Sequence, residues 1–473
     1  DSRYEMIGYE GGLKLINFFA VHNIDFNKAW KAKQSGWHDQ TRAIFANAEI
    51  GWKSMIYLTA TGRNDWDSRL AFSDYKSFFY PSIGLSAILT SMFNAPDWLT
   101  YLKVRGSYTE VGNSYGRFRT TVTYPYDEQT QSWTSTSSYP NTKLKPERTK
   151  SWEVGLDARI LNDISLNLTY YRSNTYNQTF YADLSLSSGY SNIPIQSGNI
   201  MNEGLEMSLG YNKQWKDFSF NTNYTLTWNK NRVKRLADGV YNYATGQPIQ
   251  MPELSPLTYG HTDARLILRV GGSMGDVYGQ RLLKRDLNGY ILNEEGVGLA
   301  MENKETYLGS ILPKMNMGWS LGFGYKGVNL GMTFTGRFGG IVISETQSVL
   351  DAAGVSKVSA DVRDAGGVQI NQSKVSAQTY YQTIQGTAAY YTYSATNVRL
   401  GELSLSYTLP KKWFDNKVGM TVGLVGKNLW MIYCKAPFDP ELTTSAASNF
   451  YQGFDAYMLP STRNFGFNVK FQF

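Results

Sequence analysis

The feature that most constrains this chain is an alternation of apolar and polar residues, repeated in segments of about ten residues. In the segment Phe218–Trp228, the apolar side chains of Phe220, Tyr224 and Leu226 fall at alternate positions, and Ser, Asn or Thr residues lie between them. Successive side chains of a β-strand point to opposite faces, so this pattern predicts a strand with one apolar and one polar face. A tilted strand of this length is long enough to cross the apolar layer of a membrane.

About thirteen such segments are present, which is more than a soluble β-sandwich usually supplies in one chain. The expected strands are 40–51, 53–63, 78–92, 99–111, 149–161, 163–173, 203–212, 217–229, 315–325, 327–337, 395–409, 417–430 and 461–473.

The links between the expected strands alternate strictly between short and long. The short links are 52, 93–98, 162, 213–216, 326 and 410–416, and the long links are 64–77, 112–148, 174–202, 230–314, 338–394 and 431–460. Outer-membrane barrels have short periplasmic turns and longer extracellular loops. The alternation therefore predicts an all-β, transmembrane antiparallel β-barrel in which every long link is extracellular.

Composition excludes several other classes of protein. Mean hydropathy is −0.37, and no run approaches the roughly 20 apolar residues of a transmembrane helix. The net charge is +7, but Lys and Arg are scattered and form no run typical of a nucleic-acid-binding arm. We therefore expect no nucleic-acid partner.

Sites for metals, cofactors or catalysis find little support in the sequence. A single cysteine, Cys434, excludes an internal disulfide, and the three histidines are too far apart to show a zinc-binding spacing. No pair of carboxylates has a spacing that fixes the two groups together, and no Ser/His/Asp set can be recognised. We expect no cofactor and no enzymatic activity.

The C-terminal segment repeats the alternation and ends on an aromatic residue. Its apolar positions resemble the signal by which barrel-assembly machinery recognises its clients, and they are Phe465, Phe467, Val469, Phe471 and Phe473.

Counting strands back from a periplasmic Phe473 places the first residues on the extracellular side. Bacterial single-chain barrels have an even number of strands and normally both ends in the periplasm. We therefore expect that residues 1–473 form the C-terminal part of a barrel, and that further strands belong to an N-terminal part outside this chain.

Several motifs resemble one family of membrane proteins. The Leu144-Lys-Pro-Glu147 segment, which leads from a loop into a strand, resembles the corresponding segment of TonB-dependent transporters. Other stretches, in the order found in the family, are similar to its SusC/RagA branch. They are Phe79–Ser86, Lys103–Asn113, Gly198–Glu206, Arg399–Pro410 and Phe438–Glu441.

The resemblance implies a 22-stranded barrel that encloses an N-terminal plug and is capped by a SusD-like lipoprotein. It implies location in the outer membrane of a Gram-negative bacterium, in contact with its lipids, and active import of oligosaccharides or peptides. TonB would supply the energy through the plug, which is not visible in these residues. A passive porin, and an outer-membrane barrel enzyme or adhesin, remain as alternatives.

One departure from the family pattern lies at 285–292, where Asp286-Leu-Asn288-Gly289 resembles only part of an acidic turn. Asn-Gly favours a tight hairpin in which both central residues have positive φ. A calcium loop would need more oxygen ligands than Asp286 and Asn288 supply. We expect the hairpin, with calcium as the weaker alternative.

Aromatic residues are dense in two of the expected extracellular loops. Exposed aromatic faces can stack on sugar rings or pack on peptide side chains, so both groups are candidates for contact with a ligand or with the lid. The alternatives are a membrane-interface girdle, or packing between loops and against the cap protein. The candidates are Tyr115, Phe118, Tyr124, Tyr126, Trp133 and Tyr139 in one loop, and Tyr380, Tyr381, Tyr390, Tyr391 and Tyr393 in the other.

Overall fold

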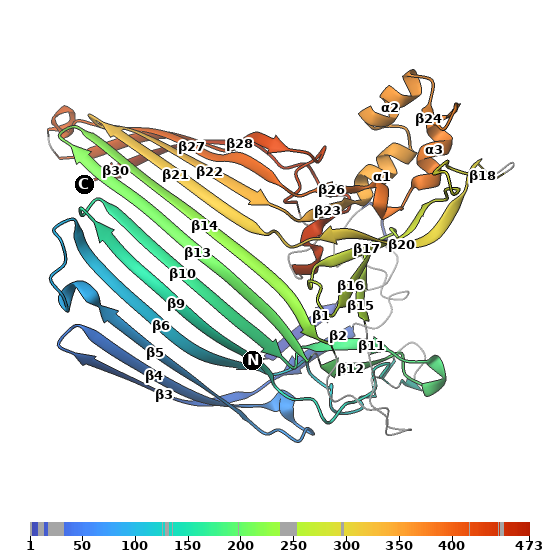
Figure 1. Cartoon of the computed structure of the whole chain (residues 1–473), viewed down its shortest axis with the longest axis horizontal. Helices are drawn as coiled ribbons and strands as arrows, with labels where there is room; N and C mark the ends of the chain where they lie inside the picture. The colour runs from blue at the N-terminus through green and yellow to red at the C-terminus, as the bar shows by residue number, and fades with distance from the viewer. Residues whose placement is uncertain are drawn as a thin grey trace.

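The computed structural model describes residues 2–7, 14–17, 33–124, 126–127, 132–134, 136–196, 198–236, 253–294, 298–415, 417–442, 444 and 449–473. Within these ranges, thirteen long strands form one sheet in which each strand pairs antiparallel with the next along the chain (Figure 1). In order they are β3 (Thr41–Trp52), β4 (Ile56–Asp67), β5 (Phe78–Ile88), β6 (Leu99–Asn113), β9 (Glu147–Ile160), β10 (Ile164–Tyr176), β13 (Asn199–Trp215), β14 (Phe218–Arg235), β21 (Met315–Tyr325), β22 (Val328–Phe338), β27 (Asn397–Leu409), β28 (Gly419–Cys434) and β30 (Asn464–Gln472).

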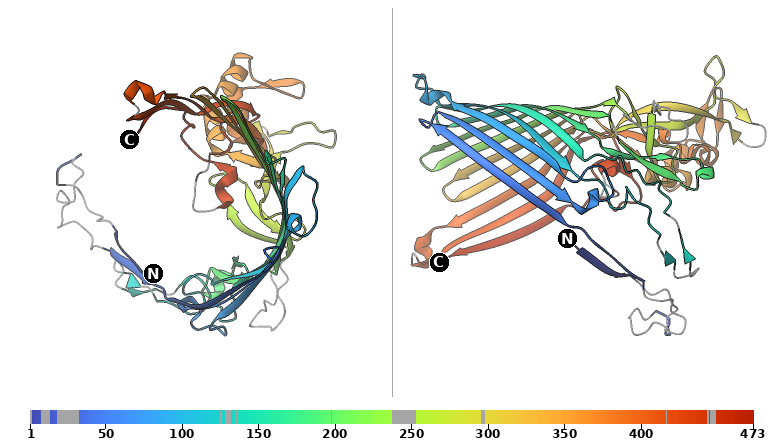
Figure 2. Two further views of the ribbon diagram at one scale, coloured as in Figure 1. Left: turned by 90° about the vertical axis from the view of Figure 1, so that its left-hand side faces the viewer. Right: turned by 90° about the horizontal axis from the view of Figure 1, so that it is seen from below.

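The thirteen expected strands are confirmed, with small errors at their ends. The expected strand 78–92 stops at Ile88, because Leu89–Ser91 forms a turn of 3₁₀-helix, η3. Conversely, β13 continues to Trp215 through residues that were expected to form a link. Figure 2 shows the sheet curving through an open arc, with β3 at one end and β30 near the other.

The short links lie at one edge of this sheet, which we call the short-turn edge, and four of the six are turns of two or three residues. Lys326 and Gly327 have φ of 46° and 88°, and they connect Tyr325 directly to its cross-strand partner Val328. Positive φ at both central residues is typical of type I′ hairpins, whose twist matches that of the strands. The long links all lie at the opposite edge, the long-loop edge.

The register of the sheet sorts its side chains by polarity. Residues directly opposite each other in neighbouring strands share a face, so Tyr224 lies beside Trp319 on one face, and Asn223 beside Ser320 on the other. The rings of Phe220 and Phe323 on the first of these faces are 5.0 Å apart. We call this the apolar face and the opposite one the polar face.

Smaller elements lie beyond the long-loop edge (Figures 1 and 2). A four-stranded sheet joins β15 (Glu253–Thr258), β16 (Arg265–Arg269), β17 (Asp276–Leu283) and β20 (Met301–Ser310), and a three-stranded one joins β26 (Thr392–Ser394), β23 (Ile341–Ser344) and β29 (Phe454–Asp455). Two-stranded pairs are β1 (Ser2–Ile7) with β2 (Lys33–His38), β7 (Tyr126–Asp127) with β8 (Ser132–Trp133), β11 (Thr179–Asp183) with β12 (Asn192–Gln196), β18 (Asn293–Glu294) with β19 (Gly298–Leu299), and β24 (Val368–Ile370) with β25 (Ser373–Val375).

The described residues of the long link 338–394 contain three α-helices that the sequence analysis did not predict. Each begins after a serine whose hydroxyl accepts a backbone N–H of the first turn, as a helix N-cap does. The three serines are Ser344, Ser356 and Ser376, and the helices are α1 (Glu345–Ala352), α2 (Lys357–Asp364) and α3 (Ala377–Ile384). In the described ranges, no helix has the length and apolar character needed to span a membrane.

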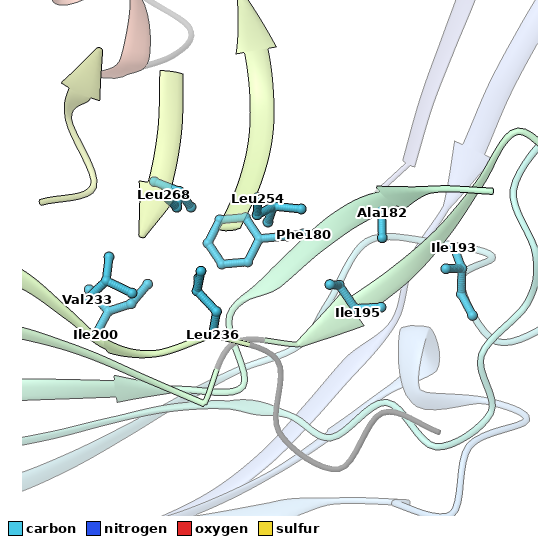
Figure 3. Packing of buried hydrophobic residues seen from close by; sticks show 9 residues of the cluster. All are labelled: Phe180, Ala182, Ile193, Ile195, Ile200, Val233, Leu236, Leu254 and Leu268. Carbon is cyan, nitrogen blue, oxygen red and sulfur yellow. The ribbon is translucent and has the colours of Figure 1, made fainter. Parts of the chain in front are cut away.

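Buried hydrophobic clusters join these outer elements to one another. One cluster joins β11 and β12 to the outer ends of β13 and β14 and to β15 and β16 (Figure 3). A second contains Tyr259, Ile343 and Phe454, which come from three different long links. The rings of Tyr259 and Phe454 are 5.1 Å apart. The long links therefore pack as a shared core at one end of the sheet.

Candidate binding surface at the long-loop edge

The structure distributes the aromatic candidates of the loop 112–148 over buried and exposed positions. Tyr115 is buried in a small cluster with Leu70 and Leu144. Tyr139 packs on the cluster of Figure 3, and its ring meets that of Tyr190 edge to face at 5.1 Å. These contacts are packing between loops, which was one of the alternatives left open for the aromatic residues.

Four other aromatic residues of this loop are open to solvent. Trp133 and Phe118 are 70% and 64% exposed, and Tyr124 and Tyr126 are also exposed. Tyr126 and Trp133 are cross-strand partners in the β7–β8 hairpin, and their ring centroids are 5.1 Å apart. Together they form an exposed aromatic pair, which can take part in stacking on a planar or ring-shaped group.

Phe118 lies in a groove of about 140 Å³ near the long-loop edge. The groove is also lined by His38, Asp39, Arg69 and Arg117. The Arg117 guanidinium binds Asp39 at 2.7 Å and stacks 3.6 Å from the centre of the Trp37 ring. This mixture of aromatic and charged groups suits a polar ligand with a carboxylate or several hydroxyls. The sequence analysis did not predict the groove, because its residues come from separate parts of the chain.

The aromatic residues of the loop 338–394 instead pack in or against a buried hydrophobic cluster. Tyr381 and Tyr391 are 7% and 3% exposed, inside a cluster that includes Leu283 and Ile384. Tyr380 packs against this cluster, and its ring meets that of Tyr381 at 5.3 Å. The rings of Tyr381 and Tyr391 are therefore not open to stacking by a ligand from solvent. Contact of this loop with the lid or with a ligand stays a prediction.

The remaining tyrosines of this loop are half-buried around the same cluster. The Tyr390 hydroxyl accepts the backbone N–H of Leu283 at 3.1 Å. Tyr393 meets Phe438 edge to face at 5.5 Å, and burial raises the pKa of the Tyr393 hydroxyl to about 12. The first contact joins η5 (Ala388–Tyr390) to β17, and the second joins β26 to the link 431–460.

A buried charge pair, which the sequence analysis did not foresee, fixes the last long link. Arg399, at the start of β27, forms two parallel hydrogen bonds of 2.9 and 2.7 Å to Asp439, and it lies 3.3 Å from Glu441. Asn397, which is fully buried, accepts from Arg399 and donates to Glu441 at 3.1 Å. The motifs Arg399–Pro410 and Phe438–Glu441 are therefore in contact, through what we call the Arg399 clamp.

The Arg399 clamp lowers the pKa of the Asp439 carboxyl group. Burial alone would raise the pKa of this carboxyl group, but hydrogen bonds from Arg399 and from the Glu441 backbone hold the pKa below its usual range. The carboxylate is thereby kept ionised and paired.

The polar face of the sheet carries a second groove, of about 170 Å³. Lys103, Arg105 and Glu153 line it together with serines and glycines of neighbouring strands. Arg105 also donates to Thr169 at 2.6 Å, so charged and hydroxyl groups form a continuous polar surface along the sheet.

The turn at Asp286 is a hairpin, as expected, but not of the expected type. Arg285 and Ile291 form an antiparallel bridge, and of the two residues expected to have positive φ only Gly289 has it, at 85°, so that part of the prediction is wrong for Asn288. The Asp286 carboxylate accepts the backbone N–H groups of Asn288 and Tyr290 at 2.9 and 2.8 Å. The side chain is thus used in the turn itself, and the described residues contain no cluster of three or more metal-binding side chains.

The C-terminal strand β30 pairs only with β28 in the described sheet. Phe465, Phe467, Val469 and Phe471 share one of its faces, and Phe465 and Phe467 are 79% and 81% exposed. Phe473 follows the strand and is almost fully exposed. Their role as an assembly signal stays a prediction.

Comparison with known proteins identifies relatives of this sheet. Residues 14–429 match the family model described as TonB dependent receptor-like, beta-barrel. TonB-dependent receptor P3 of Formosa agariphila is 24% identical over 99% of this chain and 50% of its own length. TonB-dependent receptor SusC of Bacteroides thetaiotaomicron is 25% identical over 50% of this chain and 22% of its own length.

A similar fold is found in the structure of the RagAB peptide importer in its open-open state. One of its chains superposes with a TM-score of 0.71 at 20% sequence identity, over 94% of this chain and 48% of that chain. The chain also spans about half the length of P3 and of a second relative from the same organism, TonB-dependent receptor P26.

Proposed function

The chain belongs to the TonB-dependent receptor family of outer-membrane β-barrels, and from this premise we propose that it forms the C-terminal wall of an active importer of oligosaccharides or peptides. The similarity to SusC and to a RagAB chain supports the resemblance to the SusC/RagA branch. Import by this particular protein, its ligand and its partners are the proposal.

The observation that carries the proposal is the sorting of side chains across thirteen antiparallel strands. An apolar face suits contact with lipid, and a polar face suits the lining of a water-filled passage. In the described sheet, β3 and β30 each pair with one neighbour only. An open sheet edge in hydrocarbon leaves N–H and C=O groups unpaired, at a cost of several kcal/mol each. We propose that further strands from an N-terminal segment close the barrel around a plug.

The proposed orientation places the long-loop edge outside the cell and the short-turn edge in the periplasm. A SusD-like lipoprotein would then cover the long-loop edge, where the β7–β8 hairpin and the groove at Phe118 are exposed. Ligand would be captured there and pass along the polar face, past Lys103 and Arg105. TonB would act through the plug, and none of these residues is proposed to be catalytic.

Uptake in a deletion strain tests this function. The strain lacking the full-length protein is compared with a complemented strain for uptake of labelled oligosaccharides and of labelled peptides. The importer predicts loss of uptake of one of the two classes, and loss of that same uptake when TonB is removed. Normal uptake of both classes in the deletion strain would contradict import.

The same experiment separates the alternatives. A passive porin predicts uptake that persists without TonB and ion conductance of the purified full-length protein. An adhesin or a barrel enzyme predicts loss of cell binding or hydrolysis without any transport defect.

A further inference from the structure

The apolar face changes character near the long-loop edge, where the register places charged residues in successive rows. Trp152 is paired with Tyr108 on one side and Arg172 on the other, and Arg172 is in turn paired with Glu203. Glu203 is paired with Lys230. These side chains form one continuous row across β6, β9, β10, β13 and β14, because cross-strand partners share a face.

Two further rows lie closer to the long loops. Lys150 is paired with Glu110 and with Asn174, and Arg148 follows two residues before Lys150 on the same face. Arg232 is paired with Met201. We call the five cations of these rows the cationic rim, and they are Arg148, Lys150, Arg172, Lys230 and Arg232.

The rim carries an excess of positive charge. Glu110 lies 3.1 Å from both Arg148 and Lys150, and Glu203 lies 3.8 Å from Lys230. Arg172 and Arg232 have no ion pair among the described residues. Five cations against two carboxylates leave a net charge of +3 on this part of the face.

Aromatic residues mark the depth at which the rim lies. On the side toward the short turns, the next row holds Tyr170 and Trp228, and the ring of Tyr170 is 5.4 Å from that of Trp152. Trp and Tyr concentrate at the level of lipid headgroups, where one end of the side chain is apolar and the other is hydrated. A cation one row above such a belt is at headgroup height.

The rim is also accessible from outside the sheet. The side chains of Arg148, Lys150 and Lys230 are 38%, 43% and 47% exposed. A guanidinium group can bind phosphate oxygens through two parallel hydrogen bonds. The charge, the depth and the exposure therefore complement one class of ligand.

We propose that the cationic rim binds the phosphate groups of anionic lipids in the membrane leaflet on the long-loop side. This inference rests on the membrane placement of the proposed function, but not on import. Each basic residue near an anionic membrane surface contributes about 1 kcal/mol, which is roughly a fivefold change in affinity.

The test uses the full-length protein in nanodiscs of phosphatidylcholine containing increasing amounts of lipid A, a phosphorylated lipid. Native mass spectrometry measures the lipid A retained by each protein. The variant combines Arg172→Gln with Arg232→Gln, because neither residue has an ion pair in the described part of the chain. We expect retention of lipid A to weaken more than tenfold, following roughly fivefold for each charge.

The matched control combines Lys411→Gln with Lys412→Gln, which removes two charges at the short-turn edge, in η6 (Lys411–Phe414). We expect the control to retain lipid A like the wild type. Equal retention by all three proteins, or an equal loss in the variant and the control, would overturn the proposal.

Two further measurements distinguish a lipid site from a site for free phosphate, and lipid binding from import. Displacement of lipid A from the wild type by inorganic phosphate at similar concentration would show a site for free phosphate instead of lipid, and would also overturn the proposal. Ligand uptake by the Arg172/Arg232 variant is expected to be unchanged, so that a failure of lipid binding leaves the proposed import function untouched.

Discussion

The loops 112–148 and 338–394 each contain several aromatic residues, but only the first exposes a group of them. The first exposes Tyr126 and Trp133, which are cross-strand partners in the β7–β8 hairpin. The second buries Tyr381, which belongs to α3, and Tyr391 in one cluster with Ala377 and Ile384 of the same helix. The difference lies in what surrounds each loop: helices capped by serines supply a second layer for the aromatic rings of 338–394.

The contrast between the two loops distinguishes aromatic residues that stabilise the fold from aromatic residues that are available to a partner, which the amino-acid composition does not distinguish. A buried ring contributes to stability through the apolar area it removes from water, while an exposed ring is available to a partner. The loop 338–394 is therefore expected to act as a rigid platform, and the loop 112–148 to supply contacts that change on binding.

The largest expected effect follows truncation of a core ring. Tyr391→Ala should lower the local free energy of unfolding around α1–α3 by about 4 kcal/mol, as removal of a buried aromatic side chain does. Hydrogen exchange of the peptides spanning 345–384, in the full-length protein, measures this change. Trp133→Ala is the control and should change it by less than about 0.5 kcal/mol. Similar values for the two variants would remove the distinction between the loops.

The Arg399 clamp should have the next largest effect. Arg399→Met leaves Asp439 buried without its partner, which should destabilise the link 435–463 by about 3 kcal/mol. Because the pKa of Asp439 is lowered in the folded protein, its contribution is fully present above the usual carboxyl pKa, near about 4. It is lost as the pH falls through the lowered value.

The pH dependence distinguishes a lost charge pair from a simple loss of packing. In Arg399→Met, the Arg399 hydrogen bonds no longer oppose burial, so the pKa of Asp439 should rise and the variant should recover relative stability as the pH falls. Hydrogen exchange of 435–442 at several pH values measures the gap between the two proteins. A gap that stays constant between neutral pH and pH about 4 would contradict the role assigned to the clamp.

A smaller effect is expected on ligand or partner binding by the exposed hairpin. Trp133→Ala should weaken binding of the transported ligand or of the lipoprotein lid by about 1 kcal/mol, the contribution of one aromatic contact. Titration of the purified full-length protein with each of the two candidates identifies the one affected. Tyr381→Phe, a change in the core, should leave both affinities unaltered, and if it alone weakened binding the roles of the loops would be reversed.

The smallest effect concerns a hydroxyl in the core. The Tyr391 hydroxyl has no hydrogen-bond partner among the described residues, so Tyr391→Phe removes a buried polar group without breaking a bond. Local stability should stay the same or rise by about 0.5 to 1 kcal/mol. A loss of more than about 1 kcal/mol in the same exchange experiment would show that the hydroxyl is bound in the native state.

Much of the wall could be predicted from sequence because its signal is local. Alternation within Phe218–Trp228 is set by the two faces of one strand, and it needs no knowledge of the neighbours. The family motifs were also local, and they indicated the correct family, the TonB-dependent receptors. Even here the strand ends were less certain, since Trp215 continues β13 through positions without clear alternation.

The outer region could not be predicted in the same way, because its structure depends on contacts between distant residues. Tyr259 packs on Phe454, and Arg399 pairs with Asp439, yet neither contact leaves a periodic pattern in the sequence. Signals for the helices were present at Ser344 and Ser356, but a serine cap is convincing only when the helix after it has a core to cover. The burial of Tyr391 therefore depends on parts of the chain far from it.

The second cluster, built from Tyr259, Ile343 and Phe454, has a consequence for how this protein can diversify. Its three contributors lie in three separate long links, so an insertion or replacement in one of them disturbs the packing of the other two. We therefore expect the sequences of these three links to change together. The β7–β8 hairpin lies outside that cluster, so we expect it to tolerate replacement without a change in those three links.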